Sequence, residues 1–134
     1  MTRECCIVAG IGCSTNVKTG DIVAALRLAC EKGEVPFEKL SACATGARKA
    51  YHPAILEATQ ILDLPLIILD DAHLQEMAPL LITYSSKSEK ETGIACFSEA
   101  AALAAAGSDA RLLAPRIKHA SVTCALAAGL RNGS

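Results

Sequence analysis

The stretch Ala9-Gly10-Ile11-Gly12-Cys13-Ser14-Thr15-Asn16-Val17-Lys18-Thr19-Gly20-Asp21 (AGIGCSTNVKTGD) decides how the sequence is interpreted. It follows the apolar run CCIV and precedes a segment with helical periodicity. This pattern is typical of a buried strand that turns through glycines and hydroxyl residues into a helix. In α/β proteins such turns lie at the carboxyl ends of strands, where ligands bind. The stretch therefore predicts either a ligand-binding loop or an ordinary tight turn.

Outward from this turn, the apolar pattern alternates between strands and helices. We expect strands over residues 4–10, 39–45 and 64–70, helices over 19–33, 52–63, 71–78 and 97–107, and a hairpin of 110–118 and 120–127 around His119. The strand over 64–70 is the most apolar, so we expect it to be central in the sheet. The fold class is α/β, with three α/β/α layers, a mostly parallel mixed sheet and an antiparallel C-terminal element. We expect residues 1–134 to form a single domain.

Local signals refine these boundaries. Thr19 or Asp21 is expected to cap the first helix, and Ser98 the alanine-rich one. The run SSKSEKET over 85–92 contains only hydroxyl and charged residues, which indicates a solvated loop or, alternatively, a mobile cover over a site.

Composition narrows the classes of function. The net charge is −1, and the chain has two Phe, two Tyr and no Trp, which argues against nucleic-acid binding. We see no secretory signal and no apolar run long enough to span a membrane, so we expect a soluble cytoplasmic protein. Seven cysteines occur without CxxC or HxxxH spacing, which predicts buried reduced thiols, no metal site and no cofactor. Cys13 is the exception to watch, because a thiol near a helix start can have a lowered pKa.

The opening turn lacks the third glycine of a dinucleotide fingerprint, since Thr15 stands there, and no GK[ST] closes it as a P-loop. Its amides and the hydroxyls of Ser14, Thr15 and Thr19 are able to donate to an anion. Cations gather in other loops, namely Arg48 and Lys49, and Arg116 and Lys118, with His52 and His119 beside them, and Lys18 adds a charge to the first loop. They predict a site for a ligand with several carboxylates or phosphates, unless they are solvated surface residues.

Catalytic signals are weak. The sequence has no GxSxG elbow and no carboxylate pair at a useful spacing. Glu99, His52 and Cys13 are the candidates for acid, base or nucleophile. Glu99 is equally suited to a helix N-terminus, and His52 to an ordinary surface position.

Four motifs in this order resemble a known family: the strand ending in GIGC, the segment AT…K…P.ILE.A..L.LPL, then G.ACFSEAAALAAAG, and finally RLLAPRIK…VTCALA. Over about residues 4–128 they resemble the family of CobE and the C-terminal domain of CbiG, proteins of cobalamin (vitamin B12) biosynthesis. The length is closer to stand-alone CobE. The resemblance implies an α/β/α domain that works on corrin intermediates carrying many carboxylates.

Carried over by motif position, the ligand-facing candidates are Gly10, Gly12, Cys13, Ser14, Thr15, Lys49, Glu99, Arg116, Lys118 and Thr123. Three positions depart from the family pattern. Ser14 stands where a basic residue is frequent, His52 where an acidic one is usual, and Arg116 where a lysine is usual. The last change keeps the charge and suits bidentate carboxylate binding.

Three functions follow as hypotheses. The first is a binding or carrier protein for a polycarboxylate corrin or precorrin intermediate of the hydrogenobyrinic acid type. The second is a pathway enzyme such as a lactone-opening hydrolase, as in CbiG. That activity is not carried over, because the N-terminal parts of CbiG and an assembled nucleophile and base are missing. The third is an interaction module that stabilises another pathway enzyme.

Overall fold

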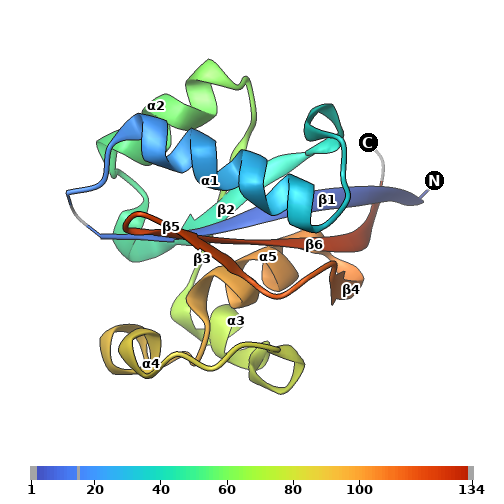
Figure 1. Ribbon diagram of the computed structural model, residues 1–134. Helices are drawn as coiled ribbons and strands as arrows, with labels where there is room; N and C mark the ends of the chain where they lie inside the picture. Colours follow the sequence, from blue (N-terminus) through green and yellow to red (C-terminus); the bar gives the residue numbers. More distant parts are fainter. Residues whose placement is uncertain (1–2, 15, 133–134) are drawn as a thin grey trace.

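The computed structural model describes residues 3–14 and 16–132, which build one six-stranded mixed sheet with helices on both faces (Figure 1). The strands are β1 (Arg3–Cys13), β2 (Ala42–Gly46), β3 (Leu66–Leu69), β4 (Ser108–Leu112), β5 (Ile117–His119) and β6 (Val122–Asn132). The α-helices are α1 (Thr19–Lys32), α2 (Pro53–Ile61), α3 (Asp71–Glu76), α4 (Ser86–Thr92) and α5 (Phe97–Ala106). Short 3₁₀ helices span Phe37–Lys39 (η1), Ala47–Lys49 (η2) and Ala78–Leu80 (η3).

Strand order across the sheet is β3-β2-β1-β6-β4, and β5 also pairs with β6. The pairs β1–β2 and β2–β3 are parallel, whereas β6 is antiparallel to β1, β4 and β5. Among the described strands, β6 is therefore the one that runs against all the others. This arrangement confirms the predicted fold class, a mostly parallel mixed sheet with an antiparallel C-terminal element. The β5–β6 pair, with Ala120 and Ser121 in the turn, is the predicted hairpin.

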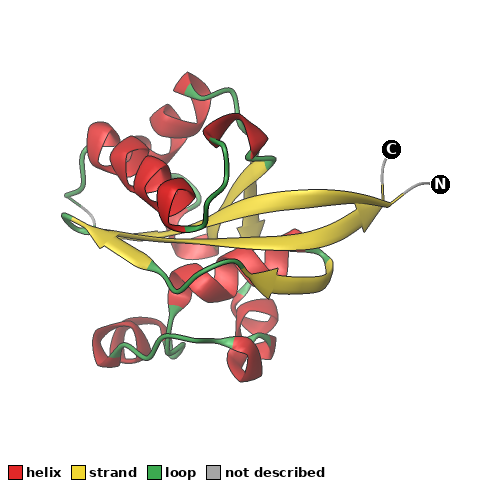
Figure 2. Cartoon of the chain, turned by 45° about the vertical axis from the view of Figure 1, so that its right-hand side comes forward, coloured by secondary structure: helices red, strands yellow, loops and turns green. Residues whose placement is uncertain are grey.

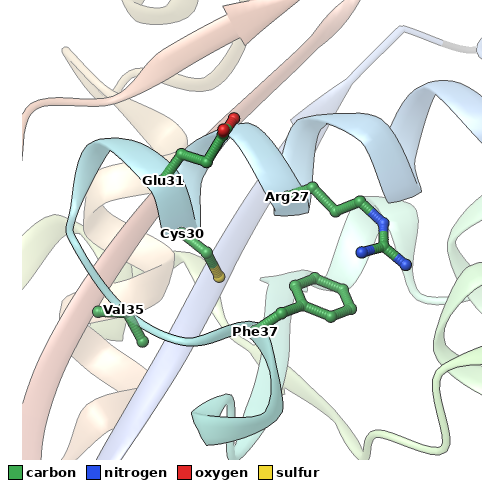
Figure 3. A pocket seen from close by; sticks show the side chains of 5 residues that line it. All are labelled: Arg27, Cys30, Glu31, Val35 and Phe37. Carbon is green, nitrogen blue, oxygen red and sulfur yellow. The ribbon is translucent and has the colours of Figure 1, made fainter.

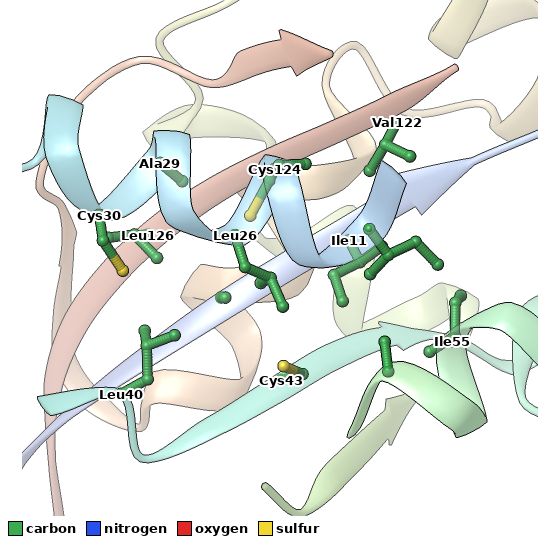
Figure 4. Packing of buried hydrophobic residues seen from close by; sticks show 14 of the residues in the cluster. Ile11, Leu26, Ala29, Cys30, Leu40, Cys43, Ile55, Val122, Cys124 and Leu126 are labelled. Carbon is green, nitrogen blue, oxygen red and sulfur yellow. The ribbon is translucent and has the colours of Figure 1, made fainter. Parts of the chain in front are cut away.

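The layers are α1 and α2 on one face of the sheet and α3, α4 and α5 on the other (Figure 2). Residues of β1 alternate between them: Ala9 and Ile11 pack toward α1 and α2, whereas Cys6 and Val8 pack toward α5. The core under α1 and α2 consists of branched aliphatic side chains, alanines and cysteines (Figure 4). Of the six cysteines whose side chains the structure describes, none is in a disulfide and five are buried, as the sequence predicts.

Alanines allow α5 to lie very close to the sheet, as expected from its sequence. A Cβ added at Gly10 would meet the Ser98 carbonyl oxygen at 2.0 Å, and one at Gly129 would meet the Ala106 oxygen at 2.4 Å. Both strands therefore need glycine where the α5 backbone crosses them. This contact gives Gly10 a packing role under α5 instead of the ligand-facing role expected for it.

The prediction that the third strand is central is wrong, because β3 lies at the edge of the sheet. Its apolar character has another cause. Leu66 packs against the core under α1 and α2, while Ile67 and Leu69 pack on the α5 side. A strand with apolar contacts on both faces is apolar whether or not both of its edges are paired, and in β3 only Ile68 is exposed.

Residues 86–92 form helix α4, so the predicted loop is wrong as well. This helix buries no residue; its ends are set by capping. The Ser85 side chain accepts the Ser88 N–H, and Gly93 ends the helix with φ 76°.

The two cap predictions have different outcomes. Helix α5 starts after Cys96, so Ser98 lies inside the first turn and does not cap it. Helix α1 starts after Lys18, whose N–H donates to the Asp21 carboxylate at 3.4 Å. Asp21 therefore takes part in the cap, and Thr19 is the first helical residue.

Candidate functional site

A cleft of about 560 Å³ opens at the carboxyl ends of β1 and β2, beside the β5–β6 turn. Five segments supply its walls: the loop after β1, η2, α4 with its flanks, the start of α5, and the hairpin. The lining residues are Gly12, Cys13, Ser14, Arg48, Lys49, Ser85, Lys87, Ser88, Glu91, Thr92, Phe97, Arg116, Lys118, Ala120, Ser121 and Thr123. Loops at this end of a parallel sheet converge because the strands that precede them point the same way.

Positive charge dominates this cleft. Of the residues described, five cations line it, namely Arg48, Lys49, Lys87, Arg116 and Lys118, against a single acidic residue, Glu91. The whole chain has a net charge of −1, so the cations are locally concentrated. Cations that converge from separate loops on one hollow attract and orient an anion with several charged groups.

One part of the cleft lining is apolar, because Phe97 belongs to it. A Cβ added at Gly46 would meet the Phe97 ring at 2.7 Å, and one at Gly12 would meet the Thr123 hydroxyl at 2.8 Å. The Phe97 ring therefore packs against the end of β2. Thr123 lies opposite Gly12 on β6 and donates its hydroxyl to the Gly12 carbonyl at 3.4 Å. The cleft thus combines an aromatic surface with a polar, cationic rim.

Helix α4 is fixed to the body of the protein and forms one wall of the cleft. Arg48 donates from Nη1 to the Glu91 carbonyl at 2.9 Å and lies 3.9 Å from the Asp71 carboxylate. The Ser88 hydroxyl donates to the Ile94 carbonyl at 2.8 Å and accepts the Phe97 N–H at 3.1 Å. The segment that was expected as a loop or a cover is therefore a side wall in this structure.

Only some of the candidates in the first loop line the cleft. Gly12, Cys13 and Ser14 line the cleft, whereas Gly10 does not, and Thr15 lies outside the described residues. Burial raises the pKa of the Cys13 thiol, and the nearby Lys49 charge lowers it by less. The structure therefore contradicts a lowered pKa: Cys13 is a protonated, weakly nucleophilic thiol at neutral pH.

Glu99 does not reach the cleft. It is fully buried, and its carboxylate accepts hydrogen bonds from Ile82, Thr83 and Arg116. All of these donors belong to the protein, so no lone pair remains directed at a ligand. The role as acid, base or ligand contact that was expected for Glu99 does not fit this burial.

His52 lies at the start of α2 and joins two loops. Its Nδ1 accepts the Ala54 N–H at 3.2 Å, so Nε2 carries the proton in the neutral ring and donates to the Ser14 carbonyl at 3.2 Å. His52 therefore caps α2 and holds the loop after β1. It does not line the cleft.

The structure brings four of the predicted ligand candidates from the other segments together. Lys49, Arg116, Lys118 and Thr123 all line the cleft. Lys18 and His119, which the sequence grouped with these cations, are not among the lining residues. Lys87 and the hydroxyl residues of α4 were missed, because SSKSEKET contains no apolar residue that would place it against the sheet. Its hydroxyls and charges beside the expected site were the available signal.

A second, smaller pocket of about 340 Å³ lies between the end of α1 and η1, at the opposite end of the sheet (Figure 3). Arg27, Cys30, Glu31, Val35 and Phe37 line it. The Arg27 guanidinium lies over the Phe37 ring, 4.5 Å from its centroid. Within the described part of the chain, no group of three or more His, Cys, Asp or Glu residues is arranged to hold a metal ion.

Comparison with known proteins agrees with this architecture. Residues 7–127 match the family model described as cobalamin synthesis G C-terminus. The chain is 34% identical over 122 residues to the protein CobE of Sinorhizobium sp., which covers 90% of this chain and 79% of that one. None of the helices described is long and apolar enough to cross a membrane.

Comparison with solved structures finds proteins of the same pathway. The crystal structure of CobE, a protein from the cobalamin (vitamin B12) biosynthetic pathway, matches with a TM-score of 0.88 at 29% identity, covering 93% of this chain and 91% of that one. The cobalamin biosynthesis protein chiG from Agrobacterium tumefaciens matches with a TM-score of 0.71 at 40% identity, over 90% and 96% of the two chains. The chain belongs to the family of CobE and the CbiG C-terminal domain, and it is a protein of cobalamin biosynthesis.

Proposed function

We propose that this protein binds a corrin or precorrin intermediate with several ionised carboxylates, of the hydrogenobyrinic acid type, in the cationic cleft. The observation that carries the proposal is the convergence of five cations from separate segments on one hollow that holds a single acid. Corrin intermediates present acetate and propionate groups around a largely apolar ring. The rim and the Phe97 surface complement those two parts of such a ligand.

The expected affinity follows from the number of contacts. A hydrogen bond to a charged group contributes about 1.5–3 kcal/mol when it is shielded from water. Three or four such contacts, reduced by the cost of ordering the ligand, give micromolar binding or better. Lys49 and Arg116 are the first candidates, because they approach the cleft from different segments and both are partly buried.

The surroundings of the three catalytic candidates favour a binding role over a catalytic one. The Cys13 thiol has a raised pKa, the Glu99 carboxylate accepts hydrogen bonds only from the protein, and both ring nitrogens of His52 are engaged. A lactone-opening hydrolase needs an available base or nucleophile near the bound substrate. We therefore propose a binding or carrier role without independent catalysis, in the reducing cytoplasm that suits cysteines outside disulfides.

The test is a titration of the protein with hydrogenobyrinic acid and its amidated forms, followed by visible absorbance and native mass spectrometry. We expect saturable binding that weakens as carboxylates become amides. Lys49→Ala and Arg116→Ala should each weaken it about tenfold. The matched controls Lys39→Ala and Arg111→Ala remove exposed cations outside the cleft and should leave it unchanged.

Two results would contradict the proposal. One is the absence of binding to any of these compounds, and the other is equal loss in the cleft and control variants. Conversion of a precorrin to a product of different mass would instead favour the enzyme. Contact with another enzyme of the pathway stays a prediction, which co-purification in the absence of tetrapyrrole tests.

A further inference from the structure

Glu99 is the one acidic side chain among the described residues that is completely buried. It is the third residue of α5, and its two oxygens accept four hydrogen bonds. The N–H groups of Ile82 and Thr83 donate to Oε1 at 2.8 and 2.9 Å. The Thr83 hydroxyl and the Arg116 N–H donate to Oε2 at 2.7 and 3.0 Å. All four hydrogen bonds are donated to the Glu99 oxygens by groups of the protein.

These contacts join two segments that are far apart in the sequence. Thr83 lies two residues before Ser85, where the α4 wall of the cleft begins. Arg116 belongs to the opposite wall, together with Lys118. One carboxylate, fixed at the start of α5, therefore connects both cationic walls through their backbones.

We propose that Glu99 is a positioning residue that sets the spacing of the two cationic walls without touching the ligand. This inference rests on the proposed function, because the spacing matters only if the cleft binds a polyanion. Through the Arg116 N–H, Glu99 fixes where the Arg116 guanidinium starts from the backbone. Through Ile82 and Thr83, it fixes the segment that leads into α4.

If Glu99 acted only through its charge, its replacement would change the affinity of the cleft in the opposite direction. The direction of the change in affinity therefore tests the inference. A buried negative charge behind a cationic cleft reduces the attraction of that cleft for an anion. Replacement by the neutral Gln would then strengthen binding. In the positioning role, the Gln amide NH₂ faces two donors that an oxygen accepted before. One wall then loses its anchor, and binding weakens.

The experiment is a double-mutant cycle measured with hydrogenobyrinic acid. Glu99→Gln is expected to weaken binding about tenfold in the wild-type background. In the Arg116→Ala background its effect should shrink to about threefold or less, because one of the groups that it positions is gone. In the Lys49→Ala background the full effect should remain, because the hydrogen-bond partners of Glu99, which are Ile82, Thr83 and Arg116, lie outside η2. The exposed Glu57→Gln is the matched control and should change nothing.

Unchanged or tighter binding by Glu99→Gln overturns the inference, and so does the same loss in the Arg116→Ala and Lys49→Ala backgrounds. If Glu99→Gln does not fold, Thr83→Val replaces it, since it removes the hydroxyl donor and keeps the shape. That variant should bind about threefold more weakly, and unchanged affinity overturns the inference.

A measurement without ligand separates this inference from the proposed function. In Glu99→Gln, amide hydrogen exchange should be faster on the side that the NH₂ group faces, either at Ile82 and Thr83 or at Arg116, while exchange at Ala42 and Cys43 in β2 stays as in the wild type. Absence of corrinoid binding by the wild-type protein removes the proposed function alone. Unchanged exchange at the three amides overturns the anchoring by Glu99 whether or not a corrinoid binds.

Discussion

The cleft and the small pocket, at opposite ends of the sheet, differ in the number of their cations and in what these cations contact. The small pocket beside α1 has a single cation, Arg27, and its guanidinium is occupied by the Phe37 ring (Figure 3). The cleft at the carboxyl ends of the strands has five cations from three segments, and of these Arg48 is tied to α4 and Asp71. Each hollow also contains a cysteine beside a cation, Cys30 near Arg27 and Cys13 near Lys49.

A concavity that contains a charged residue is therefore not by itself a binding site. In the small pocket the charge and the aromatic ring already satisfy each other within the protein. In the cleft, Arg48 is paired with Asp71, but five cations line the hollow with one acid, Glu91, so an excess of positive charge remains for solvent or a ligand to balance. The topology causes this difference, because loops after parallel strands gather at one end of the sheet.

The largest expected effect lies beneath the cleft, where α5 contacts β1. Gly10→Ala should lower the free energy of unfolding by about 3 kcal/mol or more, because its Cβ would collide with the Ser98 carbonyl. Gly20→Ala, in α1 with no atom within 4 Å of the added Cβ, should raise it by about 0.5–1 kcal/mol. Urea denaturation measures both, and equal effects would contradict the close packing of α5.

The second prediction compares the cations of the two hollows. The double variant Lys49→Ala/Arg116→Ala should bind hydrogenobyrinic acid about a hundredfold more weakly, because two charge-assisted contacts are lost. Arg27→Ala should bind it like the wild type. Isothermal titration calorimetry at fixed ionic strength is the measurement. A comparable loss from Arg27→Ala would mean that overall charge, rather than the cleft, attracts the ligand.

The third prediction compares the two cysteines by alkylation with iodoacetamide, followed by peptide mass spectrometry. Burial raises the pKa of Cys13 and of Cys30 above the usual 9.0. The reactive thiolate is therefore below about 1% at pH 7, and both rates should rise about tenfold per pH unit up to pH 9. If the alkylation rate of Cys13 reached a plateau below pH 8, its pKa would be lowered, and Cys13 would again be a candidate nucleophile.

The same assay distinguishes the surroundings of the two thiols. Lys49→Ala removes a charge that lowers the Cys13 pKa, so Cys13 should react more slowly at fixed pH while Cys30 is unchanged. A bound corrinoid should protect Cys13 about tenfold and leave Cys30 unprotected. Protection of Cys30 alone would place the ligand in the other pocket.

The smallest expected effect concerns the small pocket itself. Arg27→Ala should lower the free energy of unfolding by about 0.5–1 kcal/mol, which is typical of an exposed cation–π contact. Arg27→Lys should recover part of it, because lysine keeps the charge but not the planar stacking. Thermal unfolding of the three proteins measures the difference. A loss above 2 kcal/mol would indicate that Arg27 has a larger structural role than the stacked contact.

Much of the fold was predictable because it follows from local patterns. Glycines followed by an apolar-periodic segment gave the turn from β1 into α1, and the run PRIK…VTCALA gave the hairpin of β5 and β6. The position of β3 was not predictable from its apolarity. Burial on two faces gives the same pattern as a central position, and only the pairing of its edges separates the two.

The positions of site residues were predictable where a charged residue lies close to a strand in the sequence. They were not predictable where contacts between distant segments determine the position. Lys49 follows the end of β2 by three residues and Arg116 directly precedes β5, so the topology places them at one end of the sheet. Lys87 lies on a helix without apolar residues, which is held by Arg48 and Ser88 through contacts that no local pattern encodes. Glu99 looked like a site residue because a carboxylate in a helix's first turn has the same signature whether it faces a ligand or anchors two loops.

The most direct test of the central claim is a map of backbone amide chemical shifts during a titration with hydrogenobyrinic acid. We expect the largest shifts at Gly12, Cys13, Lys49, Lys87 and Lys118, with Arg27 and Phe37 unchanged. The same titration with the fully amidated ring should give much smaller shifts. Shifts centred on the α1–η1 pocket, or none at saturating ligand, would contradict the claim that the cationic cleft binds the corrin ring through its carboxylates.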